Sequence, residues 1–278
     1  MSDQTSADAA FDSGWLDLRE EADHRARDPN LAVELAAWWN ARGASRIVDL
    51  GSGTGSNLRY LAPHLPGVQR WTLVDHDPGL LERVRLPADG PGFRLESITP
   101  LVADLARGGL DPVATTDLVT ASALLDLVSA RWLTGLVEAC LRANAAALLA
   151  LSYDGTVQWS VPAPDDDWIL AAVNRHQLRD KGTGGALGPA AAAEAERLFR
   201  HAGYRCRLGA SPWELGRNDA ALVEELVAGW GKAAGEIAPH RSERIQEWAR
   251  ARVAAVRTGR LRVTIGHMDL LALPPEVR

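Results

Sequence analysis

Residues 46–56 read Arg-Ile-Val-Asp-Leu-Gly-Ser-Gly-Thr-Gly-Ser, a short β-type run followed by a loop with glycine at every second position. Glycine is needed where the backbone turns sharply or where a ligand approaches it closely. A dinucleotide-binding loop would read Gly-x-Gly-x-x-Gly, and its last glycine would fall at Ser56. The loop is instead Asp-x-Gly-x-Gly-x-Gly, because Asp49 stands two residues before the first glycine.

Apolar β-type runs alternate with helical segments on both sides of this loop, and this alternation predicts a parallel sheet with helices on both faces. The expected strands are 46–50, 71–74, 99–102, 117–121, 147–153, 205–208 and a last strand made of 262–265 and 270–273. Two polar residues, His267 and Asp269, interrupt the last strand, and their side chains could reach the ligand crevice.

The chain is expected to form a single domain, 15–278, after a disordered N-terminus, 1–14. This domain carries two N-terminal helices within 15–42, an insertion after the fifth strand at 154–188, and a helical insertion at 210–260. The helical insertion has apolar positions that would cover a substrate mouth or form a homodimer contact. Its arginines form a solvated face or, alternatively, bind an anionic substrate or RNA; they are Arg241, Arg244, Arg250, Arg252, Arg257 and Arg260.

Composition limits the classes of function. The 278 residues are 46% hydrophobic, which is enough for a sizeable core, and the net charge of −6 argues against charge-driven binding to nucleic acid. No run of eighteen apolar residues predicts a membrane span, and the N-terminus lacks the features of a signal peptide, so a cytoplasmic protein is expected. Cys140 and Cys206 are expected to be buried core residues, and their spacing suggests no metal site.

The string Asp-Leu-Gly-Ser-Gly-Thr-Gly resembles the first motif of class I S-adenosylmethionine (SAM)-dependent methyltransferases. The resemblance implies a Rossmann-like, doubly wound, mostly parallel seven-stranded sheet whose last strand is antiparallel. It also implies that Asp49 contacts the cofactor's ammonium, where an acid is favourable; beside a pyrophosphate it would be repulsive. The loop residues that would wrap the methionine end are Gly51, Ser52, Gly53 and Gly55.

Three later segments resemble further motifs of the same family. Asp75, with His76 beside it, stands where the family binds the ribose hydroxyls, although an acid here also caps helices. Asp104 and the backbone of Leu105 would bind the adenine, and Ser122 would line the methyl-transfer pocket. The alternative for Asp104 is an ordinary exposed residue at a strand end.

The substrate side is less readable. Asp126 stands where family members often carry an aromatic residue or histidine; it would face an amine or hydroxyl substrate or cap the helix at 129. Tyr153 ends the fifth strand, at the ligand side of such sheets. His176 is the candidate general base, although a lone histidine is more often structural or exposed. The acidic run 165–167 reads as a helix N-terminus rather than a metal site.

These features predict an enzyme that moves a methyl group from SAM to an oxygen or nitrogen of a small-molecule acceptor. One alternative is an RNA methyltransferase, but 120–126 contains neither asparagine nor proline of the family's Asn-Pro-Pro-type motif. Another is a SAM-binding protein without turnover. An NAD-dependent dehydrogenase is the least favoured alternative, because Ser56 replaces the needed glycine.

Overall fold

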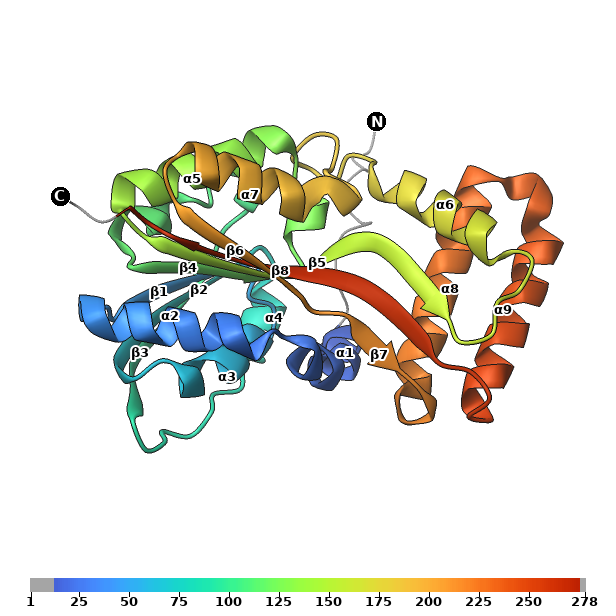
Figure 1. Ribbon diagram of the computed structural model, residues 1–278, viewed down its shortest axis with the longest axis horizontal. Helices are drawn as coiled ribbons and strands as arrows, with labels where there is room; N and C mark the ends of the chain where they lie inside the picture. The colour runs from blue at the N-terminus through green and yellow to red at the C-terminus, as the bar shows by residue number, and fades with distance from the viewer. Residues whose placement is uncertain (1–12, 276–278) are drawn as a thin grey trace.

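The computed structural model describes residues 13–275, and an eight-stranded sheet lies at its centre in the order β3-β2-β1-β4-β5-β8-β6, with β7 paired to β8 (Figure 1). The predicted disordered segment 1–14 lies outside the described residues except for its last two, which already belong to a helix. The strands are β1 Arg46–Leu50, β2 Gly67–Asp75, β3 Phe93–Val102, β4 Leu118–Ser122, β5 Ala146–Trp159, β6 Arg205–Ala210, β7 Trp213–Leu215 and β8 Val263–Leu273.

Helices cover both faces of the sheet. Helices α5 and α7 lie on one face, and α2 and α3 lie on the other (Figure 1). The helices are α1 Ser13–Ala26, α2 Pro29–Arg42, α3 Ser56–Leu61, α4 Pro78–Leu81, α5 Ala130–Ala143, α6 Asp166–Gln177, α7 Ala191–His201, α8 Ala220–Ile237 and α9 Ser242–Arg257. None of the helices within 13–275 is long and apolar enough to cross a membrane.

The strand directions confirm the predicted fold class. β1 runs parallel to β2 and β4, β4 runs parallel to β5, and β8 runs antiparallel to both β5 and β6. The expected seven strands become eight because β7, at three residues, is too short to leave a recognisable pattern.

The last strand is continuous over Val263–Leu273, so the predicted interruption at His267 and Asp269 was wrong. Both residues are buried. They share one face of the strand because their spacing is two, and each finds polar partners there. A buried polar residue breaks the apolar pattern of a strand without breaking the strand.

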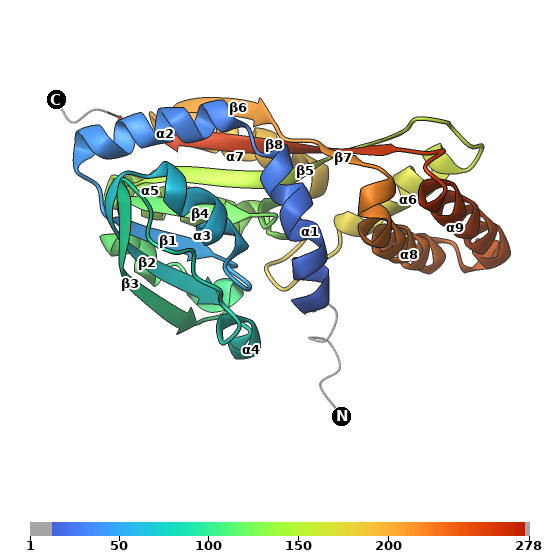
Figure 2. The same ribbon diagram turned by 90° about the horizontal axis from the view of Figure 1, so that it is seen from below.

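β5 continues to Trp159, six residues beyond the predicted end at Tyr153. Together with β8 it extends past the parallel strands to a group of three helices, α6, α8 and α9, which we call the helical lobe (Figure 2). Helix α1 lies between the sheet and this lobe (Figure 2). Helix α1 therefore lies over the ends of the strands, where ligands bind in open α/β sheets.

Candidate functional site

The glycine loop links the end of β1 to the start of α3. Gly51 and Gly53 have φ angles of 67° and 52°, in the left-handed region that glycine adopts without strain. Side chains from two other segments lie against the loop. A Cβ placed at Gly53 would lie 3.0 Å from Leu16 of α1, and one at Gly51 would lie 3.4 Å from Leu124 after β4.

Asp49, at the end of β1, presents an unsatisfied carboxylate oxygen beside this loop. The residue is 1% exposed, and its Oδ1 accepts a hydrogen bond of 2.9 Å from Asn57 Nδ2. Its Oδ2 is buried and has no hydrogen-bond partner among the described residues, and the hydroxyls of Ser52 and Thr54 share that condition. Burial raises the pKa of Asp49 from 3.8 to about 7, although Asn57 and Arg27 oppose the rise. An acceptor left open in this way fits a cationic or hydrogen-bond-donating ligand.

Asp75, at the end of β2, supports the loop from the other side. Its Oδ2 accepts from the Gly53 amide at 2.8 Å, and its Oδ1 accepts from the Asp77 amide at 3.0 Å. Each oxygen keeps a second lone pair for a further hydrogen-bond donor. His76 is largely exposed beside it, and Asp77, rather than Asp75, caps α4.

The remaining predicted cofactor residues lie at the ends of β3 and β4. Asp104 is half-exposed and accepts from the Ala106 amide at 2.8 Å, so it caps a single turn that begins at Leu105. Ser122 ends β4 and is followed by Ala123, a non-glycine residue with a φ of 52°. Such backbone strain persists only where the surroundings impose it.

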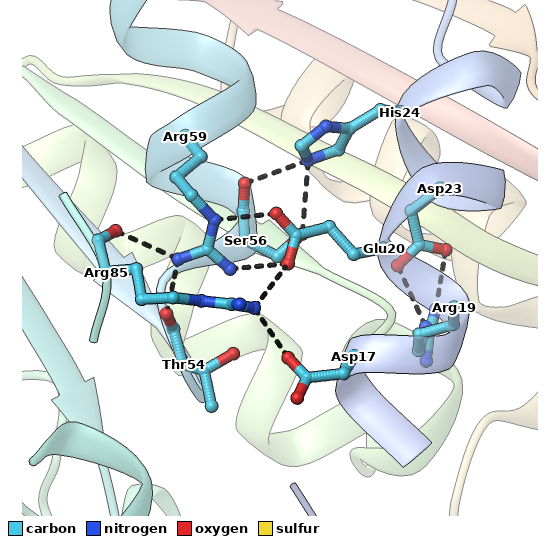
Figure 3. A network of polar contacts seen from close by, with 9 residues as sticks. All are labelled: Asp17, Arg19, Glu20, Asp23, His24, Thr54, Ser56, Arg59 and Arg85. Carbon is cyan, nitrogen blue, oxygen red and sulfur yellow. Dashed lines mark hydrogen bonds and ion pairs between the residues drawn. The ribbon is translucent and has the colours of Figure 1, made fainter. Parts of the chain in front are cut away.

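Helix α1 is tied to the glycine loop and α3 by polar contacts (Figure 3). The Arg59 guanidinium donates to both Glu20 carboxylate oxygens at 2.6 Å and to the Thr54 carbonyl at 2.6 Å. His24 Nε2 lies 3.1 Å from the Ser56 hydroxyl. These contacts hold α1 across the loop.

Five side chains from five segments form one cluster, which we call the acceptor-side cluster. Trp213 and Tyr153 both pack against His267 with tilted or edge-on rings, at centroid distances of 4.9 and 6.1 Å, and the Arg19 guanidinium lies 5.1 Å from the Trp213 ring. Asp126 is buried, and burial raises its pKa to about 6, against the opposing effect of Arg19. Ser129 rather than Asp126 caps α5, so the predicted helix-capping alternative for Asp126 is not realised.

His267 is held in one tautomer. Its Nδ1 lies 3.1 Å from the Ile265 carbonyl oxygen, which only accepts, so Nδ1 carries the proton and Nε2 keeps the lone pair. Burial, with Arg19 nearby, lowers the pKa of His267 to about 3. The ring is therefore neutral at physiological pH and has the form of a hydrogen-bond acceptor.

His176 is not brought to this cluster. It lies near the end of α6, with Nε2 3.0 Å from the Glu236 carboxylate on α8. The contacts found for His176 join two surface helices of the helical lobe. Other parts of the insertion do reach the strand ends: Asn174 of α6 accepts from the Tyr153 hydroxyl at 2.9 Å, and the Thr183 hydroxyl accepts from the Ser129 amide at 2.9 Å.

The acidic run 165–167 and two insertion arginines pair with each other. Asp165 binds Arg244, and Asp166 binds Arg252, which is 5% exposed. The prediction of a solvated basic face is therefore wrong for Arg252. The acidic run does open α6, as predicted.

Sequence reasoning gave no role to two residues that contact the site, Asn57 and Arg27. Asn57 is the second residue of α3, immediately after the glycine loop, and Arg27 precedes the break at Asp28. A polar residue at the second helical position after a strand-end loop was the available signal for Asn57. Arg27 lay in a run of charged residues and had no signal of its own.

Comparison with known proteins identifies a family for part of the chain. Residues 47–145 match the family model described as a methyltransferase domain. None of the curated proteins matches the chain.

Solved structures with a similar fold include the cyclopropane synthase MmaA2 from Mycobacterium tuberculosis, at 13% identity and a TM-score of 0.43, covering 82% of this chain and 78% of that one. A putative type II methyltransferase from Anaeromyxobacter dehalogenans has 16% identity and a TM-score of 0.45, covering 88% of this chain and 97% of that one. These similarities are too low to bear on the acceptor.

Proposed function

Because residues 47–145 match a methyltransferase domain, we propose that the chain is a class I SAM-dependent enzyme that transfers a methyl group to an oxygen or nitrogen of a small-molecule acceptor. The observation that carries the proposal is the unsatisfied Oδ2 of Asp49, buried beside a glycine loop. SAM supplies a methyl group activated by its sulfonium. The residues below would hold that cofactor and the acceptor.

The described residues fit this cofactor. Asp49 offers an open acceptor to an ammonium group, and Asp75, beside His76, keeps lone pairs for two hydroxyls. The other positions that we propose for the cofactor are the loop and the ends of β3 and β4: Gly51, Ser52, Gly53, Gly55, Asp104, Leu105 and Ser122.

For the acceptor we propose the cluster of Arg19, Asp126, Tyr153, Trp213 and His267. The Asp126 carboxylate would orient a hydroxyl or amine, and the aromatic rings would hold its apolar part. A nucleophile that carries a proton must lose it during transfer. We assign that proton to the Asp126 carboxylate, in place of the His176 expected from the sequence, because its pKa of about 6 lies near physiological pH. The neutral His267 would accept a hydrogen bond from the acceptor at Nε2. Holding the nucleophile in line with the methyl group supplies much of the rate.

The helical insertion gives less support to the RNA alternative. Three of its arginines are paired with carboxylates of the same chain, so their charge is partly neutralised; they are Arg244, Arg252 and Arg257.

Two measurements test the proposal. Calorimetry should show binding of S-adenosylhomocysteine and no binding of NAD. Incubation with methyl-labelled SAM and a metabolite extract should then give a labelled small product. NAD binding without S-adenosylhomocysteine binding would refute the cofactor, and binding without any labelled product would favour the non-catalytic alternative.

A further inference from the structure

We propose that Asn57 and Arg27 are positioning residues that present Asp49 to the cofactor: they hold the carboxylate from behind, so that Oδ2 faces the ligand's ammonium. This inference rests on the proposed function, because it takes Asp49 to bind that ammonium. It adds two residues from outside the glycine loop and ties the loop to the last strand of the sheet.

Asn57 has no freedom to turn. Its Nδ2 donates to Asp49 Oδ1 at 2.9 Å and to Thr120 Oγ1 at 2.8 Å, and its Oδ1 accepts from Arg27 at 2.9 Å. Thr120 is itself fixed, because its hydroxyl donates to the Leu148 carbonyl at 3.0 Å. The amide is therefore fully bonded, and an exchange of its nitrogen and oxygen would place like groups against each other at every contact.

Arg27 transmits the constraint from β8. Its guanidinium bonds Asp269 Oδ2 at 3.2 Å and lies 4.5 Å from the Tyr60 ring, and its side chain is 3% exposed. The other oxygen of Asp269 accepts from the Leu151 amide at 2.8 Å and from the Ser211 hydroxyl at 2.7 Å. The chain Asp269–Arg27–Asn57–Asp49 is thus a buried polar network in which the free position is Asp49 Oδ2.

The charges that face Asp49 come from two other segments. Arg27, just after α1, favours the ionised form of Asp49, and Asp75 on β2 disfavours it. The hydrogen bond from Asn57 also favours the ionised form. Removal of Asn57 therefore both frees the carboxylate to rotate and makes it harder to ionise.

The test measures the affinity for S-adenosylhomocysteine by calorimetry between pH 5.5 and pH 9, since this ligand keeps its ammonium over most of that range. The wild-type affinity should fall as Asp49 is protonated. Asn57→Ala should move the midpoint of that fall upward by about one pH unit, which means an affinity about fivefold weaker at pH 7. Asn57→Asp keeps an oxygen for Arg27 but places a second carboxylate beside Asp49, so its midpoint should move further.

Gln69→Leu is the matched control. Gln69 is another fully buried amide, donating to the Ala62 carbonyl at 2.8 Å, but the structure gives it no contact with Asp49. It should lower the melting temperature and leave the pH midpoint in place. Unchanged midpoints in both Asn57 variants would overturn the inference, whereas no binding by the wild type would overturn the proposed function instead.

Discussion

At the scale of single residues, the site contains ionisable side chains whose burial disfavours the charged form. Asp49 and Asp126 are carboxylates whose pKa burial raises to about 7 and about 6, and burial lowers the pKa of His267 to about 3. Perturbed groups of this kind gather at functional sites more often than elsewhere. Their stability effects differ in sign, which separates them experimentally.

The buried Asp49 carboxylate should destabilise the ligand-free protein at neutral and higher pH. Its folded pKa of about 7 lies above the ordinary 3.8, so the stability that its neutral form provides is lost as pH rises through that window. Asp49→Asn should therefore melt at a higher temperature than the wild type at pH 8, with the difference shrinking toward pH 4. The same variant should bind S-adenosylhomocysteine at least about tenfold more weakly. Melting curves that depend on pH equally in both proteins would contradict this account of Asp49.

The base that the structure favours and the one expected from the sequence, Asp126 and His176, can be compared directly. Asp126→Asn should reduce methyl transfer to the identified acceptor by about a hundredfold and leave the affinity for S-adenosylhomocysteine unchanged, because we place Asp126 on the acceptor side. His176→Asn should change neither quantity. Loss of turnover in the His176 variant alone would return the base to the position expected from the sequence.

At the scale of elements, helix α1 has two roles. One of its faces carries Leu16 and Glu20 toward the glycine loop, and another carries Arg19 into the acceptor-side cluster. Its contacts with the loop and α3 are polar except for Leu16, whereas Ala22 packs in the core shared with the helical lobe. An element held this way opens more readily than one held by apolar packing.

Arg59→Met should loosen α1. It removes the contacts with Glu20 and with the Thr54 carbonyl, so amide exchange across 13–26 should become faster and S-adenosylhomocysteine should dissociate sooner. Arg197→Met, which breaks a surface pair with Glu194 on α7, is the control and should leave both rates unchanged. Equal exchange rates across α1 in the Arg59 variant and the wild type would show that other contacts hold the helix.

The elements also differ in how far the sequence could predict them. Local patterns predicted the parallel strands and placed Asp49, Asp75 and Ser122 at strand ends, because strand, loop and helix follow one another within a few residues. The acceptor side could not be predicted in this way. Arg19 and His267 are brought together by α1 and β8, segments almost 250 residues apart, and no local pattern reports such a contact.

At the scale of the whole molecule, the helical lobe stands beyond the parallel sheet on the extended ends of β5 and β8 (Figure 1). Its own apolar core contains residues from α6, α8, α9 and both strands. An ion pair between Arg252 of α9 and Asp166 of α6, with side chains 6% and 12% exposed, joins two helices of the lobe. The same core includes Ala22 of α1 and the acceptor-side residues Tyr153 and Trp213, but none of the glycine-loop residues 51–55.

Arg252→Met should show this separation. Leaving the largely buried Asp166 without its partner should destabilise the protein by about 3 kcal/mol. The affinity for S-adenosylhomocysteine should stay within twofold of the wild type, because the pair lies in the helical lobe. Arg257→Met breaks an exposed pair with Glu224 and should cost less than about 1 kcal/mol. A large loss of cofactor affinity in the Arg252 variant would show that the lobe and the loop are coupled.

β8 carries groups for both halves of the proposed reaction. Asp269 anchors the network behind Asp49, and His267 stands two residues before it on the same face, at a separation of about 7 Å along the strand. A slip of one residue in this strand would turn both side chains to the opposite face of the sheet. A single register error in β8 would therefore disrupt both the cofactor side and the acceptor side of the site. We expect insertions and deletions during divergence to accumulate in the loops before and after β8. The strand itself should keep its length even where the acceptor changes.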